Sequence, residues 1–211
     1  MAATIETSSL LDRVLLITGG ARRVGAEIAR TLHAAGANVI IHYRSSARAA
    51  ATLADEFNRI RPGSAAIHAA NLLSAEAPDQ LVAAALAEFG RLDILINNAS
   101  TFYPTPVGKI TVAQWDDLMG SNLKAPLFLA QAAAQSLARQ RGLIINIVDI
   151  HGLRPLKGYP LYSAAKAGLA MLTRSLAREL GPDIRVNGIA PGPVLWAEND
   201  MDEALKREII G

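Results

Sequence analysis

Residues 13–25 read RVLLITGGARRVG, and this stretch decides the fold. Its apolar run, residues 13–18, is typical of a buried strand, and two glycines follow at once. Residues 23–35 then have a helical pattern. Glycine lets the chain turn tightly and approach a ligand, and the free N–H groups of a helix N-terminus attract an anion. The stretch therefore predicts a strand, a pyrophosphate-binding turn and a helix, or else a turn without a ligand.

Short apolar runs alternate with longer helical patterns along the rest of the chain. The predicted strands cover residues 13–18, 38–42, 64–69, 94–97, 142–148 and 184–190. The predicted helices cover residues 23–35, 47–60, 78–89 and 161–180, and one long helix follows a capping box of Thr111 and Gln114 and ends near Arg139. Apolar strands joined by helices predict a parallel sheet flanked by helices on both faces. This is an α/β fold of the doubly wound, Rossmann-like kind.

The size and composition bound the class of protein. A chain of 211 residues suits a single domain over residues 1–211, and a net charge of +2 gives little reason to expect a nucleic-acid partner. The absence of cysteine excludes disulfides, thiolate catalysis and cysteine-based metal sites, and we expect no metal. No secretory signal precedes the first strand, and no apolar run approaches the roughly 20 residues of a membrane span. We therefore expect a soluble cytoplasmic protein that acts on a small molecule.

The end of the second predicted strand indicates which dinucleotide the chain would bind. An acidic side chain there would accept from the ribose hydroxyls of NAD, but the segment after His42 is Tyr43-Arg44-Ser45-Ser46 and has no carboxylate. Arg44 can pair with a phosphate and the two hydroxyls can donate to it. This pattern favours NADPH, and the alternative is a solvated arginine on a loop.

Tyr162 and Lys166 lie four residues apart at the start of the last predicted helix. Residues at this spacing share a helix face, so the ammonium is expected beside the phenol. An adjacent positive charge would lower the pKa of the phenol and make it a proton donor near neutral pH. The alternative is a solvated helix face.

Asp149 comes just past the fifth predicted strand, at the edge of the sheet where ligands bind. Its carboxyl group could donate or relay a proton, or accept from an amino group of the substrate. The alternative is a loop or helix-cap aspartate. His151, two residues later, is a weaker candidate for the acid or base.

Five motifs occur in one order over nearly the whole chain. They are the glycine-rich turn of residues 18–25, Asn97-Asn98-Ala99, Asn122, the Tyr162–Lys166 pair and Pro191-Gly192. This ordered set resembles the short-chain dehydrogenase/reductase family. The resemblance implies a Rossmann-like fold and a nicotinamide dinucleotide cofactor.

Three departures from the family pattern narrow the resemblance. Arg23 stands where most members have a third glycine, Asp149 where most have a serine, and Ser100 where most have a glycine. These departures resemble the pteridine reductase branch, including its dihydromonapterin reductase relatives. The loop STFYPTP over residues 100–106 and the His-Tyr start of the segment after the second strand resemble the same branch.

The resemblance implies a set of residues around NADPH. Arg44, Ser45 and Ser46 would hold the 2′-phosphate. Asn71-Leu72 would lie at the adenine, in the place of the family's Asp-Leu pair, and Lys166 would bind the nicotinamide ribose. The implied cofactor-binding residues are Gly19, Arg22, Arg23, Val24, Tyr43, Arg44, Ser45, Ser46, Asn71, Leu72, Asn98, Ala99, Ser100, Lys166, Pro191 and Gly192.

The resemblance also implies roles at the reacting end. Asp149, Tyr162, Lys166 and Asn122 would be catalytic, with Asn122 supporting a water path to Lys166. Phe102 would stack on the pterin, and the alternative is a partly buried loop anchor. The implied substrate-binding residues are Arg23, Ser100, Phe102, Asp149 and Tyr162.

Three functions remain open at this stage. The first is hydride transfer from NADPH to a C=N bond of a dihydropterin, with a proton supplied through Asp149 and Tyr162. The second is a carbonyl reductase, for instance of 3-oxoacyl thioesters, in which Tyr162 protonates the oxygen without help from the family's serine. The third is a dinucleotide binder without catalysis.

The C-terminal segment carries the last expectations. Family members normally continue with a further helix and a seventh strand, so we expect a sheet that lacks that strand or is truncated there. The segment from Met201 has an incomplete helical pattern, and Trp196 would belong to a substrate lid. Family members are usually homotetramers, or dimers through the long helices, and we expect a homo-oligomer.

Overall fold

The structure is a computed structural model, and it describes residues 9–192. The expectations for Trp196 and for the segment from Met201 lie outside the described residues. Within the described range, the six strands are β1 (Val14–Ile17), β2 (Asn38–Tyr43), β3 (Ala65–Ala69), β4 (Ile94–Asn97), β5 (Leu143–Ile147) and β6 (Arg185–Ile189). They form one sheet in the order β3-β2-β1-β4-β5-β6, and every neighbouring pair is parallel.

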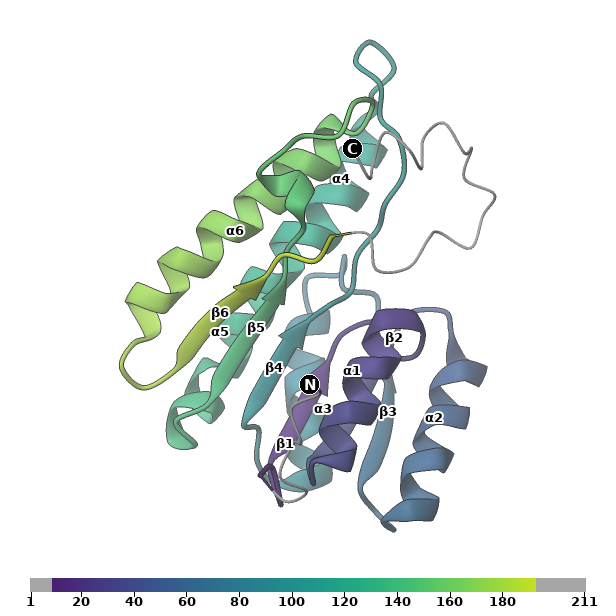
Figure 1. Ribbon diagram of the computed structural model, residues 1–211, viewed down its shortest axis with the longest axis vertical. Helices are drawn as coiled ribbons and strands as arrows, with labels where there is room; N and C mark the ends of the chain where they lie inside the picture. The colour runs from purple at the N-terminus through teal and green to yellow at the C-terminus, as the bar shows by residue number, and fades with distance from the viewer. Residues whose placement is uncertain (1–8, 193–211) are drawn as a thin grey trace, which may run out of the picture.

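The order of the strands reverses between β1 and β4, in the middle of the sheet (Figure 1). Chain connections on either side of this point run in opposite directions, so the loops at the carboxyl ends of the strands part and leave a crevice. The prediction of a Rossmann-like, doubly wound α/β fold is confirmed. The reversal also determines where a ligand can bind.

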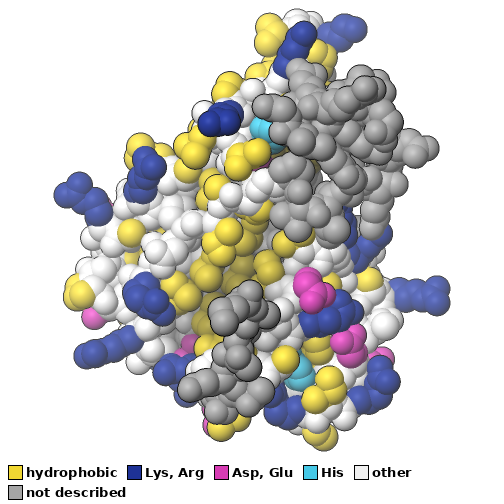
Figure 2. All heavy atoms as spheres, in the orientation of Figure 1, with side chains coloured by type: hydrophobic (Ala, Val, Ile, Leu, Met, Phe, Trp, Pro, Cys, Tyr) yellow, Lys and Arg dark blue, Asp and Glu magenta, His cyan; other side chains and the backbone are white. Residues whose placement is uncertain are grey.

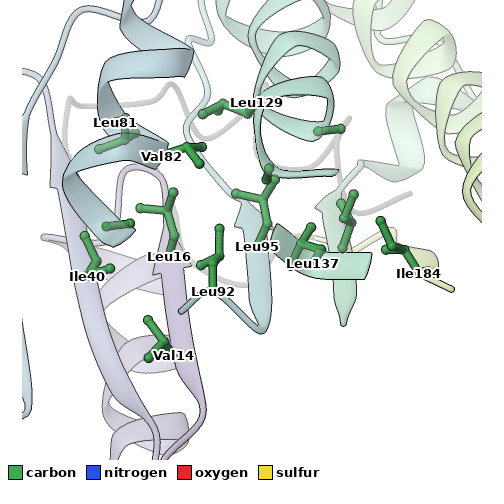
Figure 3. Packing of buried hydrophobic residues seen from close by; sticks show 14 of the residues in the cluster. Val14, Leu16, Ile40, Leu81, Val82, Leu92, Leu95, Leu129, Leu137 and Ile184 are labelled. Carbon is green, nitrogen blue, oxygen red and sulfur yellow. The ribbon is translucent and has the colours of Figure 1, made fainter. Parts of the chain in front are cut away.

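Side chains that alternate along β1 and its neighbours build a core on each face of the sheet. Leu16, Ile40 and Leu95 point to one face, where Leu81 and Leu129 cover them (Figure 3). On the opposite face, a second cluster joins strand residues to two helices through Leu15, Ile17, Val39, Ala26 and Phe57. Strands buried on both faces explain why the sequence has continuous apolar runs instead of alternation.

Five longer helices cover the two faces within the described range. On one face lie α1 (Arg23–Ala34) and α2 (Ala47–Ile60), and on the other lie α3 (Ala77–Phe89), α5 (Ala125–Arg139) and α6 (Pro160–Leu180) (Figure 1). The first pair packs over β1, β2 and β3, and hydrophobic side chains remain visible on the same side of the molecule over β4, β5 and β6 (Figure 2). None of the described helices is long and apolar enough to cross a membrane.

The long helix predicted to end near Arg139 does end there, but it is not continuous, so the prediction of one uninterrupted helix was wrong. The capping box is present, since Gln114 N donates to Thr111 Oγ1 at 3.2 Å and Thr111 N donates to Gln114 Oε1 at 3.0 Å. The helix α4 (Val112–Met119) then widens into the π-helical turn η1 (Gly120–Lys124) before α5 begins.

Side chains account for the wide turn. Ser121 Oγ donates to Asp117 O at 2.7 Å, and Asn122 Nδ2 donates to Leu118 O at 3.0 Å. These two side chains compete with backbone amides for helix carbonyls, which favours an irregular ladder. Gly120 also sits where a Cβ would come within 2.5 Å of Leu73. Single π turns of this kind occur often at functional sites.

Candidate active site

One cleft of about 520 Å³ lies at the carboxyl ends of the strands. Its walls come from the loops after five of the strands, the start of α6, and the Pro191-Gly192 segment after β6. Every predicted site residue except Asn122 lines this cleft: Gly19, Arg22, Arg23, Val24, Tyr43, Arg44, Ser45, Ser46, Asn71, Leu72, Asn98, Ala99, Ser100, Phe102, Asp149, Tyr162, Lys166, Pro191 and Gly192. The parts of the chain that carry these residues are far apart in sequence, and the fold brings them to one place.

The glycine-rich turn packs tightly against the end of β4. Asn98 Nδ2 donates to Thr18 O at 2.9 Å and to Gly19 O at 3.1 Å, while the amides of Asn98 and Ala99 both donate to Thr18 Oγ1 at 3.0 Å. Gly19 has a φ of +60°, and a Cβ there would lie 3.0 Å from Ala99 Cα. Glycine is therefore required at this position by both conformation and space.

Arg23 has a φ of +53°, in the left-handed region. This conformation explains why a glycine is common at the position in proteins that this sequence resembles, and it costs energy in an arginine. Arg22, the N-cap of α1, forms no side-chain cap, and the first turn of α1 has no acidic residue. The helix N-terminus can therefore offer its amides and its partial positive charge to an anion in the cleft.

On the loop after β2, Arg44 is the charged side chain that lines the cleft. Its side chain is 55% exposed, and Nη1 lies 3.7 Å from Asp117 Oδ1 on α4. Asn71 Oδ1 accepts from Leu73 N at 3.3 Å, so the oxygen expected to meet an adenine amino group is engaged within its own turn. The structure therefore pairs Arg44 with a carboxylate that sequence reasoning did not identify.

At the reacting end, the Tyr162 hydroxyl donates to Asp149 Oδ2 at 2.6 Å. The other carboxylate oxygen, Oδ1, accepts from His151 N at 2.8 Å, where Asp149 caps the short 3-10 helix η2 (Ile150–Gly152). Asp149 is thus a helix cap that also bonds to Tyr162, and its role in proton transfer stays a prediction. The His151 ring lines the cleft, and its Nδ1 is 3.2 Å from Arg154 O.

The expectation that Lys166 lowers the pKa of Tyr162 was wrong. Burial raises the pKa of the Tyr162 phenol well above its ordinary value, and the hydrogen bond to Asp149 and its charge add to the rise. Lys166 Nζ instead donates to Ile147 O at 2.9 Å and lies 5.7 Å from the centre of the Tyr162 ring. Burial lowers the pKa of Lys166 itself to about 8, against the opposing charge of Asp149. The carboxylate therefore outweighs the ammonium at the phenol.

Asn122 lies in the π turn and is 1% exposed, beneath the cleft and not on its wall. Ser100 Oγ donates to Asn122 Oδ1 at 2.6 Å, and Asn122 Nδ2 donates to Thr101 O at 3.0 Å. Asn122 therefore reaches the cleft through Ser100 and the loop after β4. Its water path to Lys166 stays a prediction.

The loop over residues 100–106 is held on two sides. Tyr103 donates to Asp117 Oδ2 at 3.0 Å, and burial together with this carboxylate raises the pKa of Tyr103. Phe102 stacks on Tyr159 with ring centres 4.6 Å apart and meets Tyr162 edge-on at 4.8 Å. Phe102 is thus an anchored ring at the cleft wall, and its stacking on a pterin stays a prediction.

Sequence reasoning missed three residues that support the site. Thr18 holds the amides of the segment after β4, Asp117 contacts Arg44 and Tyr103, and His42 lines the cleft from the end of β2. One signal was available for His42, because a polar ring in an apolar strand needs buried partners. Asp117 had no such signal, since its partners lie on other elements.

A cleft in a doubly wound sheet, with a tyrosine and a lysine one helical turn apart, is typical of dinucleotide-dependent oxidoreductases. The family model for the short chain dehydrogenases matches residues 13–208, and the chain belongs to this family. The resemblance stated from the motifs is thereby confirmed.

Relatives of the chain include reductases of different substrates. The chain is 40% identical to "Pteridine reductase 1" of Leishmania tarentolae, over 88% of this chain and 78% of that protein. It is 36% identical to "Short-chain dehydrogenase/reductase FrzI" of Cladobotryum sp, over 96% and 78%. It is 34% identical to a "3-oxoacyl-[acyl-carrier-protein] reductase" of Synechocystis sp., over 96% and 81%.

Proposed function

We propose that this oxidoreductase uses NADPH to reduce a C=N bond of a dihydropterin. The observation that carries the proposal is the 2.6 Å hydrogen bond from Tyr162 to Asp149 inside the cleft. A carboxylate at this place can share a proton with the phenol and can accept from an amino group, and pterins carry both a ring C=N bond and an amino group. The 40% identity to a pteridine reductase supports the same choice.

The cleft fits a phosphorylated dinucleotide. The N-terminus of α1 faces it without an acidic residue in the first turn, and this end suits a pyrophosphate. The loop after β2 contributes Arg44, Ser45 and Ser46 to the wall and no carboxylate, which suits a 2′-phosphate. Lys166 and the Pro191-Gly192 segment would flank the nicotinamide end. When bound, NADPH supplies the hydride.

The residues of this chain hold and deliver the proton. Because burial and Asp149 raise the pKa of Tyr162, its hydroxyl remains protonated at neutral pH and its hydrogen bond binds one proton between two oxygen atoms. As the carbon of the C=N bond gains a hydride, the nitrogen gains electron density and takes that proton. Asp149 holds the hydroxyl in position until the proton leaves, and Lys166 keeps a positive charge near the phenolate that remains. A proton from solvent then restores the phenol.

The substrate would lie against the ring of Phe102. This ring is 37% exposed, and its stack on Tyr159 fixes its orientation at the cleft wall. Arg23 and Ser100 line the same cleft and can donate hydrogen bonds to ring atoms of a pterin. Phe102 and Asp149 would then recognise the flat face and the amino edge of the substrate.

A carbonyl reductase of 3-oxoacyl thioesters is the second candidate function. The Tyr162 hydroxyl at the cleft can protonate an oxygen as readily as a nitrogen, and one relative at 34% identity is named for that reaction. Against it stands Asp149, whose negative charge would repel the oxygen anion that forms during carbonyl reduction.

Two measurements test the proposed function. NADPH oxidation is followed with dihydrobiopterin, dihydromonapterin, dihydrofolate and acetoacetyl thioester in parallel, with NADH as the alternative donor. We expect turnover of a dihydropterin with NADPH. The variant Asp149→Ser should lose pterin turnover and keep or gain thioester turnover. Reduction of the thioester alone would overturn the proposal in favour of the second candidate, and NADPH binding without turnover of any substrate would favour a non-catalytic binder.

We also propose a domain organisation, a location and an oligomeric state for the enzyme. Residues 1–211 form one NADP-binding domain of a cytoplasmic protein with no nucleic-acid or membrane partner. The enzyme is a homotetramer, or a dimer through α5 and α6, whose exposed Phe128 and Met171 are apolar side chains suited to a helix interface. Sedimentation of the purified chain with and without NADPH tests the oligomer, and a monomer at micromolar concentration would contradict it.

A further inference from the structure

His42 is a buried polar ring at the carboxyl end of β2. It is 2% exposed, and it lies opposite His68 in the register of the β2–β3 pair. Its ring contributes to the wall of the cleft, between the glycine-rich turn and the end of β3. The proposed mechanism does not use this ring. A buried imidazole needs hydrogen-bond partners for its nitrogens, so those partners are informative.

The partners of His42 assign its tautomer. Gly19 N donates to Nδ1 at 3.2 Å, and Nε2 lies 3.1 Å from Ala70 O. A backbone amide can only donate and a carbonyl can only accept, so Nδ1 is unprotonated and Nε2 carries the hydrogen. The ring is therefore neutral, and both of its nitrogens are used.

The same residue holds two consecutive amides of the turn. Gly20 N donates to His42 O at 3.1 Å, next to the bond from Gly19 N to the ring. Gly19 is in the left-handed conformation, and its position determines where the following amides and the N-terminus of α1 point. The contacts of His42 thus tie the turn after β1 to the ends of β2 and β3.

We infer that His42 is a positioning residue for the dinucleotide. Its neutral ring keeps the glycine-rich turn in the shape that receives the pyrophosphate, and a proton on Nδ1 removes that support. The inference rests on the proposed binding of NADPH, and it adds a residue and a pH dependence that the proposed reaction does not require.

Protonation of His42 should weaken NADPH binding. A protonated ring presents N–H groups on both sides, so the Gly19 amide would face another donor and its bond would be lost. Burial lowers the pKa of His42, and the nearby charge of His68 lowers it further, while the bond to Ala70 O opposes both. From the glycine-rich turn, the Gly19 and Gly20 amides bond to His42, and the same turn carries Arg22 and Arg23 into the cleft. On β3, the titratable ring that acts on His42 is His68. Because burial lowers the pKa of His42, NADPH affinity should fall as the pH drops through that lowered pKa, below the ordinary value of histidine.

Two substitutions separate the two ring nitrogens. His42→Asn places an amide oxygen near the position of Nδ1 and keeps an acceptor for Gly19 N. His42→Gln places its amide near the position of Nε2 and loses that acceptor. His68→Asn is the matched control, because it removes the facing titratable ring and leaves both bonds of His42 intact.

The dissociation constant of NADPH is measured by fluorescence from pH 5 to pH 8. We expect His42→Gln to weaken binding roughly tenfold at pH 7.5, the effect of one buried hydrogen bond, and His42→Asn to weaken it much less. The wild-type chain and His68→Asn should lose affinity on acidification, and His42→Asn should lose less. The 2′-phosphate also titrates near pH 6, but this contribution is common to all variants and cancels in their ratios.

Nitrogen NMR of the imidazole rings tests the tautomer in the wild-type protein. At pH 7.5 the His42 ring should show an unprotonated Nδ1 and a protonated Nε2. Circular dichroism of His42→Asn and His42→Gln should separately show that both variants are folded. The inference is overturned if wild-type protein binds NADPH while His42→Gln binds it equally well with the same pH profile, or if Nδ1 is protonated at pH 7.5. Wild-type protein that binds neither NADPH nor NADH would overturn the proposed function and this inference together.

Discussion

The hydroxyl of Tyr162 donates to Asp149 Oδ2 at 2.6 Å, and this contact, together with burial, determines the protonation state of the phenol. Lys166 does not compensate for it, because its ammonium donates to the backbone carbonyl of Ile147. In the proposed reaction the phenol would hold its proton until negative charge develops on the substrate nitrogen. A mechanism in which the lysine makes the tyrosine acidic does not fit these contacts.

Replacing Tyr162 by Phe tests this role. The variant keeps the ring that meets Phe102 edge-on and removes the hydroxyl that donates to Asp149. We expect kcat for reduction of the substrate to fall at least about a hundredfold, the usual contribution of a positioned acid. NADPH binding, measured by fluorescence, should stay close to that of the wild type. A variant that keeps the wild-type kcat would exclude Tyr162 as the proton donor.

Replacing Arg44 by Ala tests the choice of cofactor. A charge-assisted bond to the 2′-phosphate would be lost, so NADPH affinity should fall roughly 10- to 100-fold while NADH affinity changes little. Titration of both dinucleotides checks this difference. The Arg44–Asp117 pair is 3.7 Å long and its arginine is 55% exposed, so the melting temperature should hardly move. An equal loss for both dinucleotides would mean that Arg44 does not recognise the phosphate.

The sequence predicted the sheet and the members of the cleft for physical reasons that are local. Continuous apolar runs such as residues 14–17 are typical of strands buried on both faces, and the ends of parallel strands meet at one edge. Asp149 and Tyr162 could therefore be placed at the cleft without coordinates, whereas Asn98 was placed there by the resemblance to the family.

Other features depended on contacts between distant elements and could not be predicted. The π turn forms because Ser121 and Asn122 bond to helix carbonyls, a choice that helix propensity does not encode. The direction in which the pKa of Tyr162 shifts depends on how deeply the ring is buried and on which carbonyl Lys166 reaches. The bridge from Arg44 to Asp117 joins two elements that no local pattern relates.

His33 makes the stability of the fold dependent on pH. Its ring stacks on Phe57 at 4.2 Å and lies 2.7 Å from Ser64 Oγ, and burial followed by the charge of Arg61 lowers its pKa from 6.5 to about 4. As the pH falls, the unfolded chain takes up a proton before the folded chain does. Stability should therefore be constant above about pH 6.5 and decline towards pH 4, by at most about 3 kcal/mol.

Urea denaturation at pH 7 and pH 5 measures this decline. The variant His33→Gln cannot take up the proton and can still bond to Ser64, so it should lose less stability than the wild type between the two values. Comparing the two chains removes the contribution of His42, which both contain. If both chains lose the same free energy of unfolding, His33 does not titrate in this range.

Arg23 is in a strained left-handed conformation and also lines the cleft. The variant Arg23→Gly separates the two effects, because the strain changes stability and the guanidinium changes ligand binding. Glycine adopts a φ of +53° without penalty, which should stabilise the fold by about 1 kcal/mol less the entropy that glycine adds to the unfolded chain. Loss of the guanidinium should at the same time weaken NADPH binding and raise the KM of the substrate. Arg22→Gly is the control, because Arg22 is extended at φ −145° and glycine there relieves no left-handed backbone strain. Thermal unfolding should rank Arg23→Gly above Arg22→Gly, and the reverse order would show that Arg23 pays no conformational penalty.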